Sequence, residues 1–152
     1  GAIEALIEGG FPKDRIFKQS HQNSTTESAF GATNALLTTQ PGVKQWLVAG
    51  MNDAVVLGGI RAMAGVPLKT ESIIGIGING DTAIGAFREE KANGFYASVL
   101  LSSRRHGYET AERMYKWIKE GIEPPKVEYT SGILITRENY KKVYEQQGLT
   151  LP

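Results

Sequence analysis

Two kinds of apolar pattern alternate along the 152 residues of this chain. Short continuous apolar runs, typical of buried strands, predict strands at residues 15–20, 45–51, 72–78, 94–101 and 132–136. Stretches with apolar residues three or four positions apart predict helices around residues 3–7, 30–37, 56–63, 82–87, 104–120 and 140–144. Strands that alternate with helices indicate an α/β fold, with a doubly wound and mostly parallel sheet.

Two of the predicted strands are followed by an asparagine. Asn52 comes after the run at residues 45–51, and Asn79 comes after the run at residues 72–78. Ligands of open α/β sheets bind beyond the carboxyl ends of the strands, and an asparagine there offers donors and an acceptor without charge. This pair favours a neutral, polyhydroxylated ligand such as a sugar. The alternative is helix N-capping, for which asparagine is equally well suited.

Composition narrows the classes of function. The formal net charge is +1 without a basic stripe, which argues against nucleic acid and anionic membranes as partners. The chain has no cysteine, and its two histidines, His21 and His106, lack the spacing of metal ligands. No apolar run approaches the roughly 20 residues of a membrane span, and the first residues do not resemble a signal peptide. The chain begins inside an apolar periodic pattern, so we expect that a preceding segment is missing.

The chemical motifs are few. Residues 75–80 match the dinucleotide pattern G-x-G-x-x-G, but Gly75 and Gly77 are predicted to lie inside a strand, where they permit close packing. Asp53 and Asp81 are expected to cap helices. Met51 either lines a ligand site or packs in the core. Because no catalytic constellation is present, we expect no enzymatic activity, no metal and no cofactor.

Several stretches together resemble the periplasmic sugar-binding proteins of bacteria, and in particular the carboxyl-terminal half of those that bind L-arabinose. The stretches that carry this resemblance are residues 50–53, 56–61, 73–80, 94–96, 106–108, 123–126 and 134–137. The resemblance implies one lobe of a two-lobed type I periplasmic-binding-protein fold, incomplete at its N-terminus. Residues 1–103 and 130–152 would form this lobe without its first strand. Residues 104–129 would form a crossover segment that packs on the absent amino-terminal lobe.

The resemblance also implies a function in transport. Asn52 and Asn79 would hydrogen-bond the sugar, and Met51 would line the pocket. The ligand would be L-arabinose or a related monosaccharide such as galactose or fucose, and the periplasmic receptor would dock on an ABC permease. The isolated chain is expected to bind sugar poorly, and to pair with the missing lobe or with itself. The alternative is the effector domain of a sugar-responsive transcription regulator, and a nucleotide-binding enzyme is the other candidate.

Overall fold

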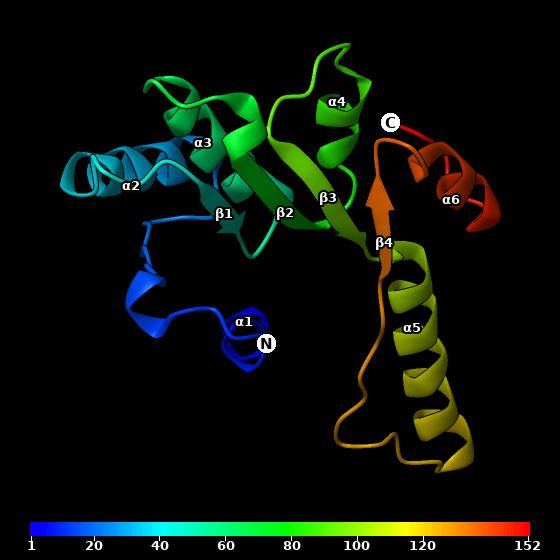
Figure 1. The fold of residues 1–152 in the computed structure, drawn as a ribbon. Coiled ribbons are helices and arrows are strands. Elements are labelled where there is room, and N and C mark those ends of the chain that lie inside the picture. Colours follow the sequence, from blue (N-terminus) through cyan, green and yellow to red (C-terminus); the bar gives the residue numbers. More distant parts are fainter.

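The computed structural model describes residues 1–152 as one four-stranded sheet, with some of the helices packed against it and others standing away from it (Figure 1). The strands are β1 (Trp46–Ala49), β2 (Ile73–Asn79), β3 (Phe95–Leu100) and β4 (Ile133–Thr136). The α-helices are α1 (Ala2–Glu8), α2 (Thr26–Thr39), α3 (Asp53–Ala64), α4 (Ala83–Arg88), α5 (Ser103–Glu120) and α6 (Tyr140–Gln146). Short 3₁₀ helices cover Lys13–Arg15 and Thr70–Ser72.

The strands follow the chain order across the sheet, β1-β2-β3-β4. β1, β2 and β3 are parallel, whereas β4 runs antiparallel to β3. The mostly parallel sheet predicted from the sequence is therefore confirmed. Because the three parallel strands end on the same side, the segments that follow them meet along one edge.

One face of the sheet is covered closely by α3. Gly75 and Gly77 of β2 make this possible, since a Cβ atom on Gly75 would lie 2.5 Å from the Ile60 side chain of α3. The core on this face also takes in buried residues of α4 and α6, among them Phe87 and Tyr144. The sequence predicted close packing at these glycines, and the structure shows that the element packed against them is α3.

The opposite face of the sheet is more open. Leu47 and Ile74 are register partners on this face, and both are exposed. Tyr96 of β3 and Leu134 of β4 are exposed as well. The residues next to them along each strand point to the covered face, so these two side chains point to the open one. Exposed apolar side chains in a contiguous array are typical of a surface that another layer covers.

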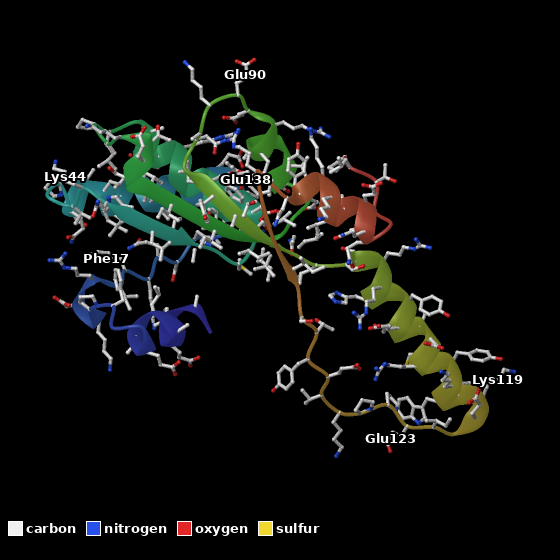
Figure 2. The ribbon with its side chains drawn as sticks, turned by 45° about the vertical axis from the view of Figure 1, so that its right-hand side comes forward. Phe17, Lys44, Glu90, Lys119, Glu123 and Glu138 are labelled. Atoms are coloured by element: carbon white, nitrogen blue, oxygen red, sulfur yellow. The ribbon has the colours of Figure 1, made fainter.

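The strand predicted at residues 15–20 is wrong. Lys13–Arg15 is a 3₁₀ helix, and the residues after it belong to none of the four strands. The backbone at Ile16 is extended, but a strand also needs hydrogen bonds to a neighbouring strand, and this segment pairs with none of the four strands. Phe17, labelled in Figure 2, packs on Trp46 instead, with ring centroids 5.8 Å apart.

α5 projects from the sheet as an arm (Figure 1). None of its 18 residues is buried, and the chain returns from its far end, near Lys119 and Glu123, to β4 (Figure 2). The returning segment is tied to the helix by an ion pair in which Arg113 donates to Glu128 at 2.6 Å. No helix of the structure combines the length and the apolar character that crossing a membrane requires.

Candidate sugar-binding site

The two asparagines lie at neighbouring strand ends, as the sequence predicted. β2 ends at Asn79, and Asn52 follows the end of β1 by a short turn. β1 and β2 pair in parallel with Ala49 opposite Ile76, so both carboxyl ends reach the same edge of the sheet. The site is therefore a polar edge built from two adjacent βα turns.

Asn52 is the N-cap of α3. Its side-chain oxygen accepts a hydrogen bond from the Val55 amide at 2.8 Å, and its side-chain nitrogen donates to the Ser24 carbonyl at 3.1 Å. The capping interpretation is confirmed for this residue. One amide hydrogen and one oxygen lone pair remain for a ligand.

Asn79 does not act as a cap. The residue before α4 is Thr82, and the Asn79 side chain is exposed and makes no hydrogen bond within the protein. Its φ of 105° is the only positive value among the residues other than glycine. Backbone conformations of this kind are rare and concentrate at functional sites. The whole amide of Asn79 is thus available to a ligand.

Asp53 lies beneath these two residues, in a role that the sequence did not reveal. It was expected to cap a helix, but the N-cap of α3 is Asn52, and Asp53 is the first residue of the helix and is 1% exposed. Its Oδ1 accepts from the Ser98 hydroxyl at 2.6 Å, and its Oδ2 accepts from the amides of Gly80 at 2.9 Å and Ala83 at 3.2 Å. The available signal was Ser98, a polar residue in an otherwise apolar strand that needs a partner when buried.

The electrostatics of this cluster are set by burial. Burial raises the pKa of the Asp53 carboxyl, while the hydrogen bonds from Ser98, Ala83 and Gly80 oppose that effect. Burial likewise raises the pKa of the Tyr144 hydroxyl, with the carboxylates of Asp81 and Asp53 adding to it. The Tyr144 hydroxyl is therefore protonated at neutral pH, and it donates to the Gly80 carbonyl at 3.2 Å.

Met51 is exposed on the turn before α3, and the Ser24 hydroxyl lies 3.3 Å from its sulfur. It borders a hollow of about 1080 Å³ beside β1, between the N-terminal segment and α2. Asn52 and Asn79 do not line this hollow. The hollow is largely apolar, and the two asparagines lie at an open edge outside it.

Other residues considered from the sequence take structural positions. Trp46 is buried against Phe17, and Trp117 lies on the exposed arm α5. The Asp81 carboxylate accepts hydrogen bonds from Thr82, the residue next to it. Gly75 and Gly77 lie inside β2, away from the turn where a pyrophosphate would need them. No group of three or more His, Cys, Asp or Glu side chains is placed to hold a metal ion.

Comparison with known proteins finds relatives of the whole chain among periplasmic sugar-binding proteins. The chain is 44% identical over 150 residues to the L-arabinose-binding periplasmic protein of Escherichia coli (strain K12), covering 98% of this chain and 46% of that protein. It is 35% identical over 150 residues to the ABC transporter L-arabinose-binding periplasmic protein of Azospirillum brasilense, covering 98% of this chain and 45% of that protein. The chain thus spans about half the length of these curated relatives.

The fold agrees with a solved structure of the same kind. The periplasmic ribose ABC transporter protein of Conexibacter woesei superposes with a TM-score of 0.73 over 95% of this chain and 46% of its own, at 24% identity. The chain is therefore a single lobe of the type I periplasmic-binding-protein fold. A family model described as periplasmic binding proteins and sugar binding domain of the LacI family matches residues 1–143. On this evidence the chain belongs to that family of periplasmic binding proteins.

Proposed function

We propose that this chain forms one wall of an L-arabinose site in the periplasmic receptor of an ABC-type importer. The observation that carries the proposal is the pair of uncharged amides at neighbouring strand ends, with the Asn79 side chain free of any protein partner. Both curated relatives are named for L-arabinose binding and for the periplasm. Asn52 and Asn79 would hydrogen-bond sugar hydroxyls, and Met51 would border the sugar.

The chemistry of the edge suits a neutral sugar. An amide side chain donates and accepts, so it matches hydroxyl groups, which also do both. The Asp53 carboxylate is buried and accepts from three protein donors, so it does not contact the ligand. Galactose and fucose also carry ring hydroxyls and are the alternatives to L-arabinose.

The proposed lobe comprises residues 1–103 and 130–152, with residues 104–129 as a crossover segment. The support is α5, which buries none of its residues and exposes Tyr108, Tyr115 and Ile118. Such a surface suits packing on a second lobe, or on another copy of the chain where that lobe is absent. In the whole receptor, sugar binding would close the two lobes about a hinge, and the closed form would dock on the permease.

The relatives are transport binding proteins and not enzymes, and we propose the same for this chain. The nucleotide-binding alternative loses its support because Gly75 and Gly77 lie within β2. The regulator alternative shares the family, but both curated relatives are transport receptors.

Replacement of Asn79 by alanine tests the assignment. L-arabinose is added to the isotope-labelled chain, and the dissociation constant is taken from the movement of NMR signals of residues near the site. Loss of the Asn79 amide should weaken binding about tenfold, because a sugar hydroxyl left without its partner costs roughly 1–3 kcal/mol.

Asn34→Ala is the matched control, since Asn34 is exposed on α2 and makes no hydrogen bond through its side chain. It should leave the dissociation constant unchanged. A change of less than twofold for Asn79→Ala, or signals that move only around the apolar hollow, would contradict the proposed site.

A further inference from the structure

We propose that Asp53 is a positioning residue, whose carboxylate fixes the two asparagine-bearing turns relative to each other and holds Asn79 in its ligand-binding conformation. This inference rests on the proposed function, because it concerns the same site. Asp53 itself is buried and does not touch the ligand.

The first step is connectivity. Asp53 directly follows Asn52, and its Oδ2 accepts a hydrogen bond at 2.9 Å from Gly80, which directly follows Asn79. Its Oδ1 is held by the Ser98 hydroxyl of β3 at 2.6 Å. One side chain therefore links the start of α3, the turn after β2 and the neighbouring strand.

The second step is the unusual backbone of the turn. Asn79 has φ 105° and Gly80 has φ 93°, so two successive residues lie in a region that residues other than glycine rarely adopt. Holding a non-glycine residue there costs free energy, which surrounding contacts must offset. Without such contacts, Asn79 would relax to negative φ and its side chain would point elsewhere.

The third step is the set of contacts that hold the turn. The Asn79 carbonyl accepts from the Leu101 amide at 3.2 Å, and the Gly80 carbonyl accepts from Tyr144 at 3.2 Å. The Gly80 amide is held by Asp53 alone. The peptide between Asn79 and Gly80 is thus fixed at its carbonyl end by β3 and at its amide end by Asp53.

The fourth step is the chemistry of the buried group. Three donors converge on Asp53, namely two backbone amides and one hydroxyl, and a carboxylate can accept from all of them. An asparagine could turn its oxygen to the two backbone amides and its NH₂ group to the Ser98 hydroxyl, but it would lose the negative charge that strengthens hydrogen bonds to a carboxylate. Asp53 forms no ion pair, so burial of its carboxylate lowers the stability of the fold. An apolar residue that only filled this space would not have that cost. β2 makes room for it with Gly77, where a Cβ would lie 2.2 Å from Oδ1.

The test compares Asp53→Asn with Ile60→Val in the 152-residue chain. Ile60 is buried on the same helix, away from the turn, and its shortening should lower the melting temperature without moving the turn. Three quantities are measured by NMR and thermal unfolding: the Gly80 amide proton shift, the three-bond HN–Hα coupling of Asn79, and the L-arabinose dissociation constant. The melting temperature of each variant is the common reference.

We expect Asp53→Asn to move the Gly80 amide proton upfield, to change the Asn79 coupling and to weaken L-arabinose binding at least fivefold. Ile60→Val should change none of the three. An Asp53→Asn chain that melts earlier, but keeps the wild-type Gly80 shift, Asn79 coupling and sugar affinity, would overturn the positioning role. If Asp53→Asn does not fold, Ser98→Ala removes one of its hydrogen bonds and is subject to the same criteria.

The two proposals fail separately. If L-arabinose moves no signal of Asn52 or Asn79 in the wild-type chain, the proposed sugar site fails. The ligand-free shift and coupling then still decide whether Asp53 fixes the Asn79 turn.

Discussion

At the scale of single residues, Gly77 leaves the space that the buried carboxylate of Asp53 occupies, because glycine has no side chain. A Cβ at this position would lie 2.2 Å from Asp53 Oδ1 and 3.0 Å from Asp53 Cα, so α3 or the carboxylate would have to move. We expect Gly77→Ala to lower the free energy of unfolding by about 1–3 kcal/mol, as overpacking does. Urea unfolding followed by circular dichroism measures this. Gly85→Ala is the control, because Gly85 is on α4 with no atom within 4 Å of an added Cβ.

In that control, alanine should raise the free energy of unfolding by up to about 1 kcal/mol, since it favours the helix over glycine. Equal effects of the two substitutions would contradict the packing argument. At this scale the sequence predicted the cap at Asn52, because capping depends on residues close in the chain. It did not predict the Asp53 cluster, whose partners Ser98 and Ala83 are 45 and 30 positions away.

At the scale of elements, the apolar pattern located most helices and strands but not their partners. β2 and α5 were predicted within a residue or two, because each has a long and regular pattern. The segment at residues 15–20 has a strand-like pattern and no pairing neighbour, so pattern alone gave the wrong element. The antiparallel direction of β4 depends on how the chain returns from α5, which no local pattern encodes.

The arm α5 is the element with the most exposed apolar surface. Tyr115 and Ile118 are exposed in this chain, so replacing both by glutamine should leave the free energy of unfolding within about 1 kcal/mol of wild type. The same double substitution should weaken self-association, which sedimentation velocity over a range of concentrations detects. Glu120→Gln, at the polar end of the same helix, should leave association unchanged. A wild-type chain that sediments as a stable monomer at all concentrations would contradict this prediction.

At the scale of the whole molecule, two apolar regions are open at once. One is the sheet face around Leu47 and Ile74, where Leu47 also lines the hollow beside β1, and the other is the arm α5. With this much apolar area exposed, the chain of 152 residues buries a smaller fraction of its surface than a compact domain of the same size would bury. The edge that we propose for sugar binding is open as well, since neither Asn52 nor Asn79 lines the hollow beside β1.

The open edge limits the affinity of the chain by itself. The Asn52 side chain makes two hydrogen bonds within the protein, whereas the Asn79 side chain makes none. Each neutral hydrogen bond contributes on the order of 1 kcal/mol net, whereas micromolar binding needs about 8 kcal/mol. We therefore expect a dissociation constant for L-arabinose no tighter than about 1 mM, where the free energy is about 4 kcal/mol.

Isothermal titration calorimetry at micromolar protein should show no saturable heat, while NMR at higher sugar concentration should show weak, saturable shifts at the two asparagines. Micromolar binding by calorimetry would overturn this limit, because the two asparagines of an open edge do not supply the free energy that it requires.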